Sequence, residues 1–158
     1  MNANKDTLAA ILMEQFPDQS AVACAQTEFR RSGFDFKLTV QPDQLLKAAT
    51  VVRDQGFAID MVTAVDWPEE EQFELIYDFM HFESALRVAM HTRVSRGKPS
   101  IESLSGIFPG ANWHERETAE FFGINFLNHP NLIHLLLPED MEGYPLRKDF
   151  KPPASPYY

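Results

Sequence analysis

Apolar and polar residues alternate along this chain in the two periods that regular secondary structure imposes. Four apolar residues near the start recur at the spacing of one helix face: Leu8, Ile11, Leu12 and Phe16. They predict a first helix that Thr7 caps and Pro17 ends.

Strand patterns follow this first helix. Residues 21–29 predict a strand and residues 30–33 a turn. Phe34–Val40 predict a second strand, in which apolar and polar residues alternate so regularly that one face should be exposed to solvent. The two strands are therefore expected to pair as a hairpin. A second helix should begin at Pro42 and Asp43 and end at Gly56. Its predicted inward residues are Leu45, Ala48, Ala49 and Val52.

Three further strands are predicted at residues 57–67, 73–82 and 85–94. The acidic turn 68–71 separates the first two, and Glu83-Ser84 joins the last two tightly. Because short links favour neighbouring antiparallel strands, we expect an antiparallel sheet.

The predicted order of elements is helix, two strands, helix, three strands and helix, which is typical of an α+β fold. We expect a two-layer domain at residues 1–125, with a mostly antiparallel sheet covered by helices on one face. Residues 126–158 should form an extended C-terminal tail of the same domain, lying across it or across a partner. The tail's prolines exclude another long helix: Pro130, Pro138, Pro145, Pro152 and Pro153.

The last predicted helix carries one unusual face. Trp113, Glu117 and Phe121 are four residues apart and share a stripe, so a carboxylate sits between two aromatic rings. The stripe predicts a docking surface or a helix held by its own tail, although a solvated capping helix remains an alternative. Since burying an unpaired ion is costly, Glu117 should have a cationic partner. The candidates are Arg116, Arg147 and Lys148.

Four motifs in this region give the chain a family resemblance. They are residues 113–117 (WHERE), 121–124 (FFGI), 129–130 (HP) and 143–150 (GYPLRKDF). In this order they resemble the C subunit of the proton-pumping NADH-quinone oxidoreductase, respiratory complex I, a family that includes its thirty-kilodalton mitochondrial counterpart. The resemblance makes these residues the candidate interface: Trp113, Glu115, Arg116, Glu117, Phe121, Gly123, His129, Pro130, Arg147, Lys148 and Asp149.

The chain departs from this family pattern at two places. Glu120 stands where the family usually has Asp. Ile133-His134 stands where two basic residues usually follow the His-Pro motif, so positive charge is missing from a presumed contact strand.

The resemblance implies a scaffold subunit without a cofactor, in the peripheral arm on the cytoplasmic side of the membrane. Its partners would be the D-type subunit at the quinone end and the B- and I-type subunits that carry iron–sulfur clusters. One alternative is the corresponding subunit of a related complex. This complex would be a membrane-bound, energy-converting nickel–iron hydrogenase, a formate hydrogenlyase or a complex that takes electrons from another donor.

Composition narrows the possible partners. With 158 residues and 44% hydrophobic residues, the chain suits one folded domain. Lys and Arg number 14 against 23 Asp and Glu, and the formal charge of −9 disfavours nucleic acid and anionic lipid. The start of the chain predicts no secretory signal, and no stretch approaches the ~18 apolar residues of a membrane span. At a membrane, the protein would have to be held by another protein.

Candidate chemistry is sparse. Cys24 is the single cysteine, lies in an apolar run and predicts an inert thiol, a reducing compartment and no iron–sulfur cluster. His114-Glu115 begins a zinc motif that Thr118 breaks, and His129 and His134 should point to opposite faces. No glycine-rich phosphate loop is present. A free-standing enzyme with an acid–base site among Glu115, Glu117 and His129 is the alternative from another class.

Overall fold

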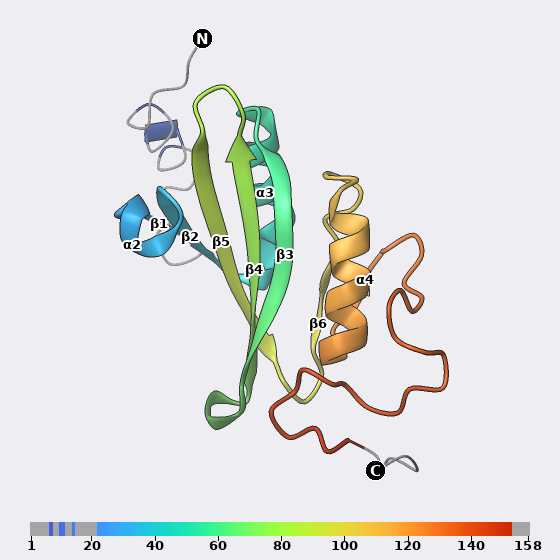
Figure 1. Cartoon of the computed structure of the whole chain (residues 1–158). Helices are drawn as coiled ribbons and strands as arrows, with labels where there is room; N and C mark the ends of the chain where they lie inside the picture. Colours follow the sequence, from blue (N-terminus) through green and yellow to red (C-terminus); the bar gives the residue numbers. More distant parts are fainter. Residues whose placement is uncertain (1–6, 8–9, 12–13, 15–21, 153–158) are drawn as a thin grey trace.

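A mixed sheet of five strands forms the centre of the molecule in the computed structural model, which describes residues 7, 10, 11, 14 and 22–152 (Figure 1). The spatial order is β1-β2-β5-β4-β3. The strands are β1 Val22–Gln26, β2 Phe36–Val40, β3 Ala58–Trp67, β4 Gln72–His81 and β5 Leu86–Ser95. The first predicted helix, at residues 7–17, lies for the most part outside the described residues.

Strand pairing follows the predictions with one addition. β1 and β2 pair antiparallel as the expected hairpin, and β3, β4 and β5 pair antiparallel through their short links. The connection predicted as a turn at 30–33 is a short helix, α2 Phe29–Ser32, which Gly33 ends with a φ of 81°. The addition is a parallel pairing of β2 with β5, which the alternation of residues alone does not predict.

Helix α3 covers one face of this sheet. It spans Leu45–Asp54 and continues a 3₁₀ turn at Pro42–Gln44, whose proline suits a first helical turn. Its four predicted inward residues are all buried, as expected: Leu45, Ala48, Ala49 and Val52. They meet the alternate apolar side chains that β4 turns inward, so the sheet and α3 form the two predicted layers.

Helix α4, Ala111–Phe122, packs beside the edge strand β3 (Figure 1). The Phe122 ring meets Phe73 of β4 edge-on at a centroid distance of 6.0 Å, and the Thr118 hydroxyl donates to the Val62 carbonyl of β3. The helix therefore covers an edge that would otherwise offer unpaired backbone groups.

A second, two-stranded parallel sheet frames α4. It pairs β6 Ser100–Glu102 with β7 Asn125–Leu127, on either side of the helix in sequence. Both strands are too short for the sequence to predict, and β7 begins at the point where the sequence indicates an extended tail.

From residue 128 to residue 152 the chain contains neither helix nor strand, which confirms the predicted lack of a helix for the described part of the tail. This segment bends around α4 and returns beneath it toward the lower end of the sheet (Figure 1). It therefore lies across its own domain, one of the two placements that the sequence allows.

Candidate docking site

Helix α4 turns a charged face inward. It ends at Gly123, whose φ of 74° allows its N–H to reach the Ala119 carbonyl at 2.8 Å. The buried residues of the helix include Glu115, Arg116 and Glu120. Because a buried charge is costly without partners, each of these side chains needs hydrogen bonds from outside the helix.

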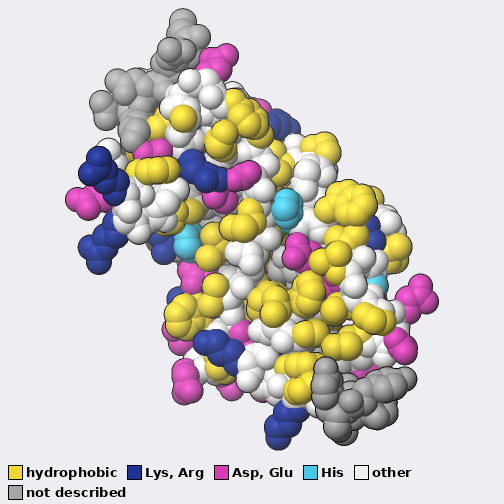
Figure 2. Space-filling model, in the orientation of Figure 1, with side chains coloured by type: hydrophobic (Ala, Val, Ile, Leu, Met, Phe, Trp, Pro, Cys, Tyr) yellow, Lys and Arg dark blue, Asp and Glu magenta, His cyan; other side chains and the backbone are white. Residues whose placement is uncertain are grey.

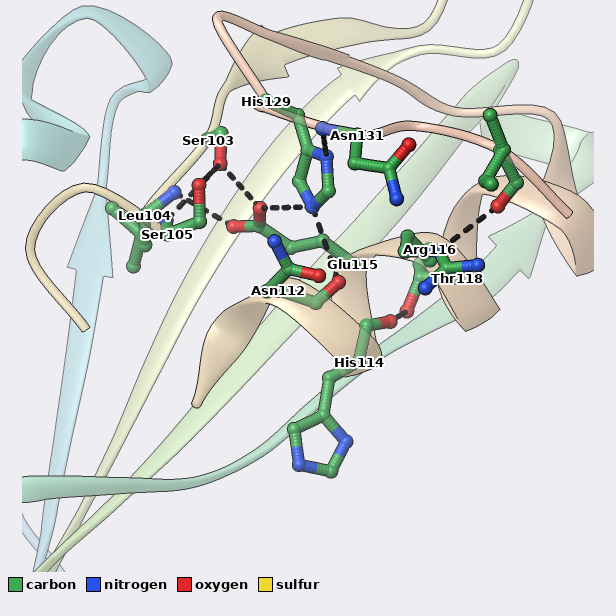
Figure 3. Close-up of polar contacts among 11 residues, drawn as sticks. Ser103, Leu104, Ser105, Asn112, His114, Glu115, Arg116, Thr118, His129 and Asn131 are labelled. Atoms are coloured by element: carbon green, nitrogen blue, oxygen red, sulfur yellow. Dashed lines mark hydrogen bonds and ion pairs between the residues drawn. The ribbon is translucent and has the colours of Figure 1, made fainter. Parts of the chain in front are cut away.

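Glu115 finds its partners in the segment after β6. Its Oε1 accepts the Leu104 backbone N–H at 2.7 Å, and its Oε2 accepts the Ser103 hydroxyl (Figure 3). The side chain has no exposed surface. Burial raises the pKa of Glu115 to about 7, although the two hydrogen bonds act in the opposite direction.

His129 closes this cluster from the tail (Figure 3). Its Nε2 lies 3.1 Å from the Asn112 carbonyl and 3.9 Å from Glu115 Oε2, while its Nδ1 accepts the Asn131 N–H at 3.0 Å. These bonds fit a neutral ring with its hydrogen on Nε2, which donates to the carbonyl. His129 thus anchors the start of the tail, and Pro130 after it is exposed at the turn.

Arg116 holds the next part of the tail. Its guanidinium donates from Nε to the Ile133 carbonyl at 3.0 Å and from Nη2 to the His134 carbonyl at 2.8 Å. It also lies 5.4 Å from the centre of the Trp113 ring. Its contact with Ile133-His134 uses backbone carbonyls, so the tether does not depend on which side chains these two positions carry.

Glu120 provides the third attachment. Its carboxylate accepts three consecutive backbone N–H groups of the tail, at 2.9, 2.9 and 3.2 Å: Leu135, Leu136 and Leu137. Burial alone would raise the pKa of Glu120, but these three hydrogen bonds hold it below its usual value. Glu120 and Arg116 together hold five consecutive tail residues through their backbone.

Arg147 fastens the far part of the tail to the end of α4. Its Nε donates to the Phe122 carbonyl at 2.6 Å, and its guanidinium lies 4.5 Å from the centre of the Tyr144 ring. Gly123 makes this approach possible, because a Cβ there would lie 2.5 Å from Tyr144 Cζ and 2.7 Å from Arg147 Nη2. Tail and helix end therefore fit only around a glycine.

The last attachment joins the tail to the sheet. Asp66, buried at the end of β3, accepts the Lys148 backbone N–H at 2.8 Å, while Arg96 after β5 bridges Asp66 at 2.8 Å and Asp149 at 2.6 Å. Burial of Asp66 would raise its pKa, but the bonds from Arg96 and Lys148 lower it. The sequence analysis missed Asp66 and Arg96. The signal for Asp66 is present, since it continues the inward register of Val62 and Ala64.

The stripe of Trp113, Glu117 and Phe121 faces outward at its first two residues, while Phe121 is half-buried and packs against the core. Trp113 is 62% exposed and Glu117 is exposed. In the described residues no ion pair joins Glu117 to Arg116, Arg147 or Lys148, because both arginines hold backbone carbonyls instead. The expected internal partner of Glu117 is therefore wrong, and the exposed part of the stripe consists of Trp113 and Glu117.

Metal and nucleophile chemistry find little support in the same region. The described residues contain no group of three or more His, Cys, Asp or Glu placed to hold a metal ion. Thr118, which breaks the zinc motif, binds the carbonyls of His114 and Val62. Burial raises the pKa of Cys24 and so favours its unreactive thiol form. What the arrangement offers is a rigid surface.

Comparison with known proteins gives this surface a context. A family model described as the 30 Kd subunit of respiratory-chain NADH dehydrogenase matches residues 38–156, a range that contains every candidate interface residue. The C subunit of the NADH-quinone oxidoreductase of Roseiflexus castenholzii is 36% identical over 154 residues, an alignment that covers 94% of this chain and 85% of the relative.

Two further similarities broaden the comparison. The C subunit of the F(420)H(2) dehydrogenase of Methanosarcina mazei is 42% identical over 91 residues, which cover 57% of this chain and 58% of the relative. A chain of the membrane-bound sulfane sulfur reductase, an archaeal respiratory membrane complex, superposes with a TM-score of 0.76 at 24% identity, over 90% of this chain and 84% of that one. At this identity the superposition shows a shared fold.

The close fit at Gly123 yields a first prediction. Gly123→Ala should lower the free energy of unfolding by at least about 1 kcal/mol more than Gly33→Ala, measured by urea denaturation. Both glycines have positive φ, but a Cβ at Gly33 would meet nothing within 4 Å, so the difference isolates the displacement of Tyr144 and Arg147. Equal losses would show that the tail does not press on the helix end.

Hydrogen exchange tests the attachment by Glu120. In the isolated chain, Glu120→Ala should accelerate amide exchange at residues 135–137, because the variant removes the acceptor of all three N–H groups. Stability should fall by about 1–3 kcal/mol. Glu117→Ala, on the exposed face of the same helix, is the control and should leave this exchange unchanged. Fast exchange at 135–137 already in the unaltered chain would contradict the attachment.

The pKa of Glu115 predicts a pH dependence of stability. Between the ordinary glutamate pKa of 4.5 and about 7, the folded state keeps a proton that the unfolded chain has lost, so rising pH destabilises the fold. Glu115→Gln should therefore gain stability relative to the unaltered chain across this window, by up to about 1.4 kcal/mol per pH unit, and no further above it.

Urea unfolding of both proteins from pH 4.5 to pH 8 measures this difference. The contributions of titrating groups that both proteins share cancel in this difference, except for groups that contact Glu115, such as His129. Burial and then the Glu115 charge raise the pKa of Tyr77 well above its usual value, so Tyr77 does not titrate in this range. The exposed Glu83→Gln serves as the control and should show no trend. A flat difference for Glu115→Gln would mean that this carboxylate is ionised throughout.

Proposed function

Because this chain belongs to the family of the 30 Kd subunit of respiratory-chain NADH dehydrogenase, we propose that it is a cofactor-free scaffold subunit in the peripheral arm of a proton-pumping NADH-quinone oxidoreductase. In this role it supports electron transfer from NADH to quinone indirectly. It holds the D-type subunit at the quinone end and the B- and I-type subunits that carry iron–sulfur clusters.

The observation that carries this proposal is a fixed backbone with exposed apolar side chains. The tail is tied down by Arg116 and Glu120, yet Ile133 is 60% exposed and Leu136 is 62% exposed. A mobile tail could fold such side chains away, whereas this tail holds them toward solvent. Apolar groups held in this way are favourable where another protein covers them.

The proposed location is the cytoplasmic side of the cell membrane, reached through partner subunits. Within the part of the chain that the structure describes, no helix is long and apolar enough to cross a bilayer. Contact with partner proteins would therefore provide the attachment. The formal net charge of the chain, −9, favours attachment through partner proteins over direct binding to anionic lipid.

The same fold also suits related machines. The similarity to the C subunit of an F(420)H(2) dehydrogenase supports, as an alternative to the main proposal, a complex that takes electrons from another donor. A nickel–iron hydrogenase or formate hydrogenlyase belongs to the same alternative. The proteins that accompany the chain distinguish these machines.

The geometry gives little support to a free-standing enzyme. Of its three candidate residues, Glu115 and His129 lie together with no exposed side-chain surface, where a substrate has no access to them. Glu117 lies apart from them on the exposed face of α4. The three residues therefore do not form one acid–base site.

Co-purification tests the scaffold proposal. A tagged chain isolated from its source membranes should bring D-, B- and I-type subunits and NADH-quinone reductase activity. The double variant Ile133→Asp and Leu136→Asp should reduce their yield at least tenfold, because it places two charges in an apolar contact. Phe82→Asp is the matched control, as Phe82 is 71% exposed in the turn after β4.

The melting temperature of each isolated variant should stay close to that of the unaltered chain, since all three side chains are exposed. A chain that purifies alone and remains monomeric would contradict the scaffold role. Recovery of hydrogenase subunits instead would select the alternative machine.

A further inference from the structure

A groove lies between β3, α4 and the returning tail, beside the attachment of the tail to the end of α4. Its volume is about 220 Å³, and its lining includes Met61 of β3, His114, Glu117 and Phe121 of α4, and Leu146 of the tail. Three distant parts of the sequence thus contribute to one surface feature.

The walls of the groove are held in place by the fold itself. The Leu146 backbone N–H donates to the Phe121 carbonyl at 3.1 Å, and Thr118 joins α4 to the Val62 carbonyl of β3. The Arg147 bond to the Phe122 carbonyl fixes the residue that follows Leu146. A ligand of this groove would therefore meet a preformed site and need to order little of it.

The rim of the groove carries exposed apolar side chains. Met61 is 42% exposed, Leu146 is 53% exposed and Trp113, next to the groove on α4, is 62% exposed. Figure 2 shows hydrophobic side chains gathered on this face of the molecule, over the side where α4 and the tail lie. Such a gathering of apolar groups is typical of an interaction surface.

Glu117 introduces a charge into this apolar surface. The other two carboxylates of α4, Glu115 and Glu120, are buried and accept hydrogen bonds within the domain. Glu117 has no ion pair among the described residues and lines the groove. A carboxylate beside apolar walls matches a long cationic side chain, which places its methylene stem on the walls and its charge on the carboxylate.

We propose that this groove binds a segment of a partner subunit that sets a Lys or Arg side chain on Glu117, with flanking aliphatic side chains against Met61, Phe121 and Leu146. This inference rests on the proposed scaffold function and specifies the chemistry of one contact. The charge of −9 favours a basic segment over an acidic one during approach.

Photo-crosslinking within the assembled complex tests the proposal. The chain is produced in its source with p-benzoylphenylalanine in place of Leu146 or, separately, of Leu136, and the isolated complex is irradiated. Leu146 reports on the groove, whereas Leu136 reports on the exposed tail outside it. Mass spectrometry should find, on the Leu146 probe, a partner peptide with Lys or Arg beside aliphatic residues.

Charge reversal supplies the second measurement. Glu117→Lys in the same chain should lower the yield of the Leu146 crosslink at least fivefold, because like charges would then meet across the contact. Glu83→Lys makes the same change at an exposed site in the turn after β4 and should leave the yield unchanged. Replacing the identified partner cation with Glu should restore the crosslink to the Glu117→Lys chain.

The two probes separate failure of this inference from failure of the scaffold role. Crosslinks from Leu136 without any from Leu146 would overturn the groove proposal and leave the scaffold function standing. A Leu146 crosslink to a second copy of this chain, or to a partner peptide without a cation, would also overturn it. If neither probe crosslinks to a partner in the isolated complex, the result would count against the scaffold function itself.

Discussion

The arrangement of this molecule depends on an exchange of hydrogen bonds between a charged helix face and an irregular backbone. The described tail, residues 128–152, has no sheet or helix to satisfy its N–H and C=O groups. Helix α4 in turn buries Arg116 and Glu120, which would be costly alone. Glu120 accepts from three consecutive N–H groups, and Arg116 donates to the two carbonyls just before them. The helix thus satisfies backbone groups of the tail, and the tail provides partners for the buried charges of the helix. This exchange explains how a proline-rich tail can lie fixed on the domain.

Much of the central fold could be predicted because it depends on periodicity. The β1–β2 hairpin, the antiparallel run β3–β4–β5 and the inward face of α3 all follow from alternation or helical spacing. Short strands such as β6 and β7, and the parallel pairing of β2 with β5, depend on long-range contacts that leave no local pattern. The attachments of α4 were predicted only in part for a related reason. The stripe of Trp113 and Phe121 suggested a docking surface or a helix held by its tail, but the sequence could not identify the partners of the buried charges, because these partners are backbone groups of the tail, which every sequence possesses.

Backbone groups also take part in the attachments at the two places where the sequence departs from the family pattern that it resembles. Ile133 and His134 lack the expected positive charge, yet their carbonyls still bind Arg116. Glu120 in place of the usual Asp keeps a carboxylate for the N–H groups that follow. The path of the tail thus depends on the chemistry of its attachment and leaves the exposed side chains free to differ. A surface built in this way can change its partner contacts without changing its own fold.

The hydrogen bond between Asp66 and Lys148 joins residues 82 positions apart, so it can form only after the tail has been synthesised. Ribosomes produce the sheet and α4 before residues 133–149, so Asp66 stays without its Lys148 partner until 82 further residues have been added. Closing a contact of such long sequence separation also carries a large loop-closure entropy. The groove wall at Leu146 is therefore completed only after the rest of the domain exists. A partner that recognises the finished groove would discriminate mature chains from nascent ones, which gives assembly an inherent order.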